Sequence, residues 1–217
     1  LVNGKAYLYA SKNGTTLTYT GMPYSGNGQV DLVYSSNAQE FKGWNLVGNP
    51  FSQIAYIADE RSFYTMNAQG SEIEPATSTS IESMEGIFVI AEEEGETMTF
   101  TTEEPNGNKS MLALNLSNSH NVIDRAIVRF GEGRQLPKFQ LNPNHTKVYI
   151  PQDNKDYAVV NADEMGEMPV SFKAESNGSY TLSFNAEGVS FAYLHLIDNL
   201  TDKDVDLLAG ASTGSAT

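Results

Sequence analysis

The stretch Gly43-Trp44-Asn45-Leu46-Val47-Gly48-Asn49-Pro50-Phe51 contains the only tryptophan of the chain and has the pattern of one β-strand with a sharp end. Side chains along a strand alternate between its two faces, so Trp44 and Leu46 would share one face. Pro50 has no N–H for a β-ladder, and a residue that precedes a proline avoids helical geometry. The pattern predicts that Trp44 fills the core of an all-β domain, with neighbouring strands paired around it.

The residues before this stretch have the pattern of a β-hairpin. The segment Lys12-Asn13-Gly14 contains Asn-Gly, which is a strong hairpin-turn signal. On its C-terminal side, Leu17 and Tyr19 alternate with threonines, as expected for a strand with one apolar face. We therefore expect strands at residues 5–10 and 15–20, followed by another at 30–34.

The rest of the chain repeats this rhythm of short apolar alternations separated by turn residues. Further strands are expected at residues 63–66, 86–91, 97–102, 111–116, 125–130, 147–150, 157–161, 170–174, 180–184 and 191–198. The acidic run 92–96 and the pair Asn177-Gly178 are predicted to be hairpin turns that join the strands on either side. Short strands about ten residues apart indicate a sandwich or a barrel, and no segment has helical periodicity.

These patterns predict an all-β protein of two sandwich-like domains, the second with a Greek-key or Ig-like arrangement. The boundary is expected at Glu103-Glu104-Pro105-Asn106-Gly107-Asn108, where charge, proline and glycine combine. The first domain would then span residues 1–104 and the second 109–209. Residues 210–217 are small and polar, so a flexible tail is predicted there.

Composition excludes several classes of function. The chain has 217 residues, 13 Lys and Arg against 27 Asp and Glu, and a net charge of −14. An acidic chain without a basic cluster does not suit nucleic acid or an anionic membrane surface. The absence of cysteine removes disulfides, thiol nucleophiles and thiolate metal sites. No apolar run is long enough to span a membrane, and we expect neither membrane insertion nor a cofactor.

Five segments of the chain resemble a known protein group. The first stretch, with residues 63–67 (Phe-Tyr-Thr-Met-Asn) and 84–89 (Met-Glu-Gly-Ile-Phe-Val), resembles a segment of secreted and surface proteins of the Bacteroides group, where a "GWNLVGNPF" strand precedes a "GxFV" strand. Residues 193–201 and 205–208 are similar to the last β-domain of those proteins, which is related to the C-terminal sorting domains of type IX secretion. The resemblance implies a bacterial β-protein, extracellular or on the cell surface, from a group with mostly unassigned functions.

Catalytic residues are not predicted. A nucleophilic triad needs a nucleophile, a base and an orienting acid, yet His120 and His145 lie in loop-like contexts and His195 within a strand. Pairs of acids such as Asp163 with Glu164 sit at expected turns, where a solvated charge explains them, although paired carboxylates also serve glycoside hydrolysis. The sequence therefore predicts a protein that is not an enzyme, with a hydrolase domain as the alternative.

The acidic segment near the C-terminus is a candidate metal site. Asp202, Asp204 and Asp206 have the spacing of the first three ligands of an EF-hand loop. The sixth position of such a loop is Leu207 here, where glycine is needed, and the twelfth is Thr213 in place of glutamate. A hairpin turn followed by an acidic edge strand is the simpler interpretation, and calcium stays the alternative.

Tyrosines are the candidate ligand contacts. Tyr7, Tyr9 and Tyr19 are expected along the first hairpin, where aromatic rings either stack on sugars or pack across strands. We expect a non-enzymatic extracellular module, structural or adhesive, whose partners are other surface proteins or glycans. The alternative is a carbohydrate-binding module of a polysaccharide-uptake or adhesion system. The pattern does not predict an oligomeric state.

Overall fold

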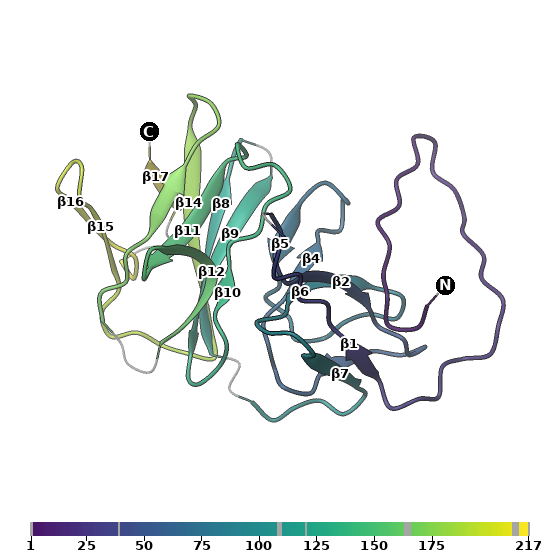
Figure 1. Ribbon diagram of the computed structural model, residues 1–217. Coiled ribbons are helices and arrows are strands. Elements are labelled where there is room, and N and C mark those ends of the chain that lie inside the picture. Colours follow the sequence, from purple (N-terminus) through teal and green to yellow (C-terminus); the bar gives the residue numbers. More distant parts are fainter. Residues whose placement is uncertain are drawn as a thin grey trace. The chain divides into compact units, whose positions relative to one another are not determined.

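The structure is a computed structural model that describes residues 2–38, 40–107, 110–119, 121–162, 166–209 and 213–216, the last four by their backbone only. All regular elements in these residues are β-strands, and none is a helix (Figure 1). The predicted all-β class is confirmed. The Greek-key or Ig-like arrangement of the second half stays a prediction.

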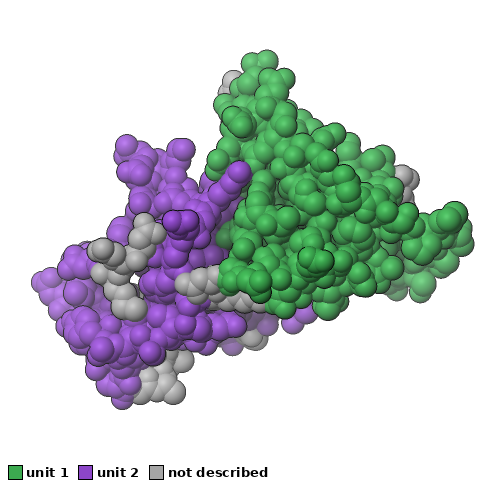
Figure 2. All heavy atoms as spheres, turned by 90° about the horizontal axis from the view of Figure 1, so that it is seen from below, with its two compact units in different colours: residues 1–66, 78–107 green, residues 67–77, 108–217 purple. Residues whose placement is uncertain are grey.

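The chain divides into two compact units, coloured separately in Figure 2. Unit 1 contains residues 1–66 and 78–107, and unit 2 contains residues 67–77 and 108–217. Nothing in the sequence indicated that residues 67–77 group with the C-terminal half.

Unit 1 has its strands in two sheets. In one sheet β7 (Thr97–Thr101) lies between β1 (Gln29–Asp31) and β3 (Tyr56–Ile57). In the other, β6 (Gly86–Ile90) lies between β2 (Trp44–Gly48) and β4 (Tyr64–Met66). The strands on either side of the acidic run 92–96 therefore belong to different sheets. The predicted hairpin at that run is wrong, because β6 and β7 each pair with strands from elsewhere in the chain.

The first stretch forms β2 as expected, but its buried side chain is not the expected one. Val47 is only 3% exposed, whereas Trp44 and Leu46 on the opposite face are half-buried. The Trp44 ring packs edge-on against the ring of Tyr64, with centroids 5.7 Å apart. The prediction that Trp44 fills the core is wrong, because β2 is covered on both faces and the deeper face carries Val47.

Asn49 fixes the end of this stretch. It is buried, at 5% exposure, and its side-chain Nδ2 lies 2.9 to 3.0 Å from three carbonyl oxygens, those of Gln53, Ile81 and Glu82. Its Oδ1 accepts the N–H of Phe51 at 2.9 Å. A buried amide with all its polar atoms engaged stabilises a turn that carries no ladder of its own.

Asn45 makes similar side-chain hydrogen bonds to the backbone at the start of the stretch. Its Oδ1 accepts the backbone N–H of Val33 at 2.8 Å, and its Nδ2 donates to the Val33 carbonyl at 3.0 Å. The same Nδ2 lies 2.8 Å from the carbonyl oxygen of Gly43. One side-chain amide thus substitutes for a neighbouring strand and holds the chain that follows β1.

The hairpin predicted at residues 5–20 does not form. Lys5 makes an isolated bridge to Val47, and the Ala6 N–H donates to the carbonyl of Leu46 at 3.3 Å, but no strand follows. Residues 7–23 are all exposed, and no hydrogen bond or ring contact joins them to one another or to other described residues. We call residues 7–23 the arm; Figure 1 shows it as a long open loop near the N-terminus.

Unit 2 contains one larger sheet, a separate hairpin and the strand β5, which belongs to neither of them. Its strands are β5 (Ile73–Pro75), β8 (Met111–Ser117), β9 (Val122–Phe130), β10 (Leu136–Pro137), β11 (Lys147–Gln152), β12 (Lys155–Ala162), β13 (Ser171–Lys173), β14 (Tyr180–Glu187), β15 (His195–Asp198), β16 (Lys203–Asp206) and β17 (Thr213–Ala216). The sheet order is β13-β11-β12-β9-β8-β14-β17, with β10 paired to β12. The pair β15–β16 stands outside it as a two-stranded sheet.

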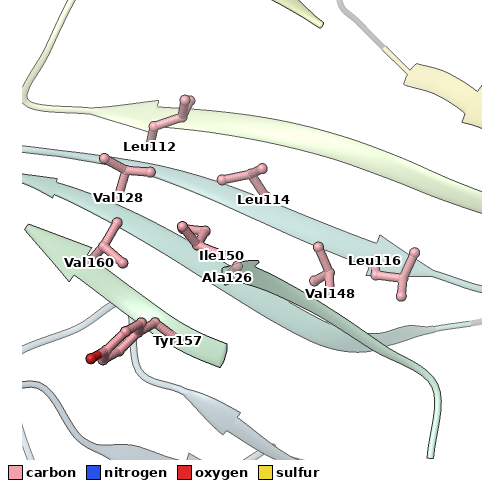
Figure 3. Close-up of a cluster of buried hydrophobic side chains, with 9 residues drawn as sticks. All are labelled: Leu112, Leu114, Leu116, Ala126, Val128, Val148, Ile150, Tyr157 and Val160. Atoms are coloured by element: carbon pink, nitrogen blue, oxygen red, sulfur yellow. The ribbon is translucent and has the colours of Figure 1, made fainter. Parts of the chain in front are cut away.

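The core of unit 2 lies between two groups of strands that belong to this sheet. Figure 3 shows side chains of β8 and β9, such as Leu114 and Val128, facing Val148 and Ile150 of β11. β12 joins the two groups, because it pairs antiparallel with β11 and parallel with β9. Leu112 and Leu116, the other leucines of the expected alternation, are buried in the same cluster.

Two further predictions about unit 2 concern the turn at residues 177–178 and the C-terminal tail. Asn177-Gly178 was predicted to close a hairpin, but β13 pairs with β11 and β14 pairs with β8, so that prediction is wrong. Within the tail, residues 213–216 form β17, which pairs with β14, and the other residues of 210–217 lie outside the described residues. A ladder uses backbone groups, so small side chains do not prevent pairing there.

Candidate functional site

The histidines do not form a catalytic constellation in the part of the chain that the structure describes. His120 lies outside the described residues. In β15, the ring of His195 stacks on Tyr193, with centroids 4.0 Å apart, and its Nδ1 lies 2.6 Å from Oδ1 of Asp204. His145 is in unit 2, at a surface hollow of about 440 Å³. His145 thus faces a space that a small molecule can enter.

The hollow is lined from four separated segments of unit 2. Glu72 comes from residues 67–77, and His145 from the loop before β11. The turn between β8 and β9 and the β13–β14 connection supply the rest, mostly small polar residues and the ring of Tyr180. Hydrogen bonds with Ser176 and Thr146 lower the pKa of Tyr180 below its ordinary value. This lining offers hydroxyl, amide and carboxylate groups beside one aromatic ring.

The charged groups of the hollow surround one imidazole. Nε2 of His145 lies 3.2 Å from Oε2 of Glu72, and Nδ1 lies 3.8 Å from Oε2 of Glu175. Each carboxylate thus contacts a different nitrogen of the same ring, which lies between them. Glycoside hydrolysis needs a substrate bond between the two carboxyl groups, and here that position is occupied by protein.

The acidic segment forms the β15–β16 hairpin. Asp202 lies at its turn with φ 53°, Asp204 contacts His195, and Oδ1 of Asp206 accepts the N–H of Leu208 at 2.8 Å. Among the residues that the structure describes, no three His, Cys, Asp or Glu side chains are arranged to hold a metal ion. Of the acids named above for hydrolysis, Asp163 and Glu164 lie outside the described residues.

Two buried ion pairs hold the scaffold. In unit 2, Nζ of Lys138 lies 2.6 Å from the carboxylate of Asp124, which also accepts the Val148 N–H at 2.8 Å. Burial lowers the pKa of Lys138, and the neighbouring carboxylate opposes that shift. In unit 1, the buried Arg61 binds Asp59, and its Nη1 lies 3.0 Å from Glu96. These charges are paired inside the fold, so we assign them to structure.

The candidate tyrosines all lie on the arm. Tyr7 and Tyr9 are each 60% exposed and Tyr19 is 54% exposed. Large apolar side chains accompany them on the same segment: Leu8, Leu17 and Met22, the last at 95% exposure. A soluble protein rarely exposes such a group of apolar side chains unless a partner covers it.

The arm is also unusual in length. It is anchored at Ala6, by the bond to Leu46, and at Tyr24, whose ring packs on Phe51 and whose hydroxyl accepts the Gly28 N–H at 3.2 Å. Between these anchors the 17 residues from 7 to 23 contain a turn at residues 12–13 but no strand or helix. Loops of this length in compact domains are uncommon and are usually functional or disordered.

Comparison with known proteins gives no match to a family model, to a curated protein sequence or to a solved structure. No segment of the described chain forms an apolar helix with the length needed to cross a lipid bilayer.

Sequence reasoning found the tyrosines but missed the hollow. Its lining residues come from four segments spread over more than a hundred positions, and none has a pattern that marks a site. The unpaired state of the arm was missed as well. Residues 1–30 contain Lys5 and Lys12 but no Asp or Glu, which distinguishes this segment from the acidic remainder of the chain but does not indicate that it is unpaired.

Proposed function

We propose that this chain is a non-enzymatic interaction module, structural or adhesive, of a bacterial protein that is secreted or held at the cell surface. The observation that carries the proposal is the exposed arm with its six large apolar side chains. The likeness of residues 43–51 to surface proteins of the Bacteroides group supports the location. The arm is held at both ends by unit 1, so a rigid β-scaffold presents it to a partner.

Binding of the purified chain to intact cells of the producing bacterium tests the proposal. The arm variant replaces Tyr7, Tyr9 and Tyr19 by serine, and Leu141→Ser is the matched control, since Leu141 is 55% exposed but lies in unit 2. We expect the wild type and the control to bind and the arm variant to lose most of the binding. Protease treatment of the cells should abolish binding, and periodate oxidation of their glycans should leave it unchanged. Equal binding by the arm variant would contradict the proposal.

Carbohydrate binding is the second candidate, and the hollow of unit 2 favours it. Sugars are bound by planar polar groups together with an aromatic ring, and the hollow offers amides of Asn118 and Asn177 near Tyr180. A glycan array with the wild type and with Asn118→Ala/Asn177→Ala tests this. Binding that the double variant loses supports the candidate, and an array without signal above background removes it.

A further inference from the structure

Among the residues that the structure describes, the β15–β16 hairpin of unit 2 has no third strand. Its register pairs His195 with Asp206, Leu196 with Val205, and Ile197 with Asp204. No other described strand pairs with either of its edges. A two-stranded hairpin is only marginally stable in water, and its outer edges present unpaired N–H and C=O groups. This hairpin is therefore a template for an added strand.

One face of the hairpin combines apolar side chains with acidic ones. Directly opposed residues share a face, so Ile197 and Asp204 lie together with His195 and Asp206. Tyr193 stacks on His195 and continues this face. Tyr193 is 69% exposed and Ile197 is 55% exposed, so both remain open to a partner.

The charges of the arm and of the hairpin are opposite. The arm carries one lysine, Lys12, and no acid, within a chain whose net charge is −14. Residues 193–208 contain four aspartates and a single lysine, Lys203. Opposite charges steer two surfaces together and discourage the pairing of like surfaces, such as one arm with another.

Other edges suit the arm less well. The end strand β13 carries one charged residue, Lys173, and no acidic residue. The outer side of β2 already takes the bridge from Lys5 and the bond from Ala6. Acidic charge, exposed apolar side chains and free edges occur together at the β15–β16 hairpin.

We propose that the arm of one copy of this chain adds as a β-strand to the β15–β16 hairpin of a second copy. This inference rests on the proposed function, and it names the partner of the arm. Residues 7–10 and 15–20 of the arm carry Tyr7, Tyr9 and Tyr19, so either run provides backbone groups for a ladder and tyrosines for the exposed face. The two surfaces differ, so the contact is heterologous and joins copies head to tail into an open chain.

Sedimentation velocity over a series of concentrations tests the inference. The wild type should form larger species as its concentration rises. The arm variant Tyr7→Ser/Tyr9→Ser/Tyr19→Ser and the hairpin variant Tyr193→Ser/Ile197→Ser should each weaken association about tenfold or more, because buried tyrosines dominate such contacts. Leu141→Ser should associate as the wild type does. All the replaced side chains are exposed, so each variant should fold.

Mixing the two variants gives the decisive measurement. The hairpin variant keeps an intact arm and the arm variant keeps an intact hairpin, so an equimolar mixture should form a dimer that does not grow further. Neither variant should do so alone. A hairpin variant that still associates by itself would overturn the inference, and so would a mixture that stays monomeric.

Two further measurements test the nature of the contact. Hydrogen exchange should slow at alternate amides of one arm run in the associated form, because a ladder protects the amides that point to the partner strand. Unchanged exchange would contradict strand addition. Association should also weaken as salt is added, and an affinity that does not fall would contradict the choice of the acidic hairpin.

The outcomes separate this inference from the proposed function. If the wild type stays monomeric at all concentrations while the arm variant still loses its binding to cells, the inference fails and the proposed function holds. If the arm variant binds cells as the wild type does and also associates normally, both fail.

Discussion

Two segments of unit 1 have equally good strand patterns, and only one of them is a strand. Residues 43–51 form β2, paired with β6 and held at both ends by the side chains of Asn45 and Asn49. The arm has alternating apolar residues and an Asn-Gly turn, but no ladder. The difference is what surrounds them: β2 has residues packed on both faces, whereas nothing described covers the arm. An alternating pattern predicts extended backbone, and a second layer decides whether it is paired.

The largest effect that we expect on stability is from Asn49→Asp. A carboxylate at this buried position removes both N–H donors and places negative charge beside three carbonyl oxygens. The free energy of unfolding should fall by about 3 kcal/mol or more. Urea unfolding followed by tryptophan fluorescence measures it, because Trp44 is the only tryptophan and reports on unit 1.

The control for that variant is Asn13→Asp in the arm. Asn13 is exposed and has no described partner, so its replacement should change the free energy of unfolding by less than about 0.5 kcal/mol. A large loss at Asn13 would mean that the arm is part of a folded layer in the monomer, and the contrast between the two segments would then be wrong.

A smaller effect is expected at a pair of glycines with similar backbone conformations. Gly43 has φ +77°, and a Cβ there would lie 2.2 Å from the carbonyl oxygen of Ala91. Gly14 has φ +65° and no atom within 4 Å of such a Cβ. Gly43→Ala should lower the free energy of unfolding by about 2 kcal/mol, from left-handed strain and overpacking. Gly14→Ala should lower the free energy of unfolding by less, because the unpaired arm is free to relax. An equal loss for the two variants would show that the backbone at Gly14 is as constrained as at Gly43.

The last comparison needs no substitution, because it measures hydrogen exchange of the wild-type chain. In dilute solution the amides of residues 7–23 should exchange without protection, since no described acceptor binds them. The amides of β2 that donate to β6 should exchange much more slowly. Protection of the arm at a concentration where the protein is monomeric would show that it pairs within its own chain.

The same comparison explains how far sequence reasoning reached. Strands were placed correctly where apolar residues alternate, as at Leu112, Leu114 and Leu116 in β8. Besides the hairpin at residues 5–20, which does not form, pairing was wrong at two further supposed hairpins, 92–96 and 177–178, because a turn sequence fixes a reversal of the chain but not the sheet that the returning strand joins. The sequence identified the candidate tyrosines, but it did not show how exposed they are. Their exposure follows from the absence of the hairpin that was predicted for residues 5–20.

The sequence by itself determined that this protein is all-β, where most of its strands lie, and that it is acidic, because alternation and charge are properties of short stretches and of composition. Only the tertiary structure decided which strands pair, which face of β2 is buried, and that the arm stays uncovered. Pairing and burial depend on surfaces supplied by residues far along the chain, such as β6 for β2 and β12 for β9. No local pattern contains that information.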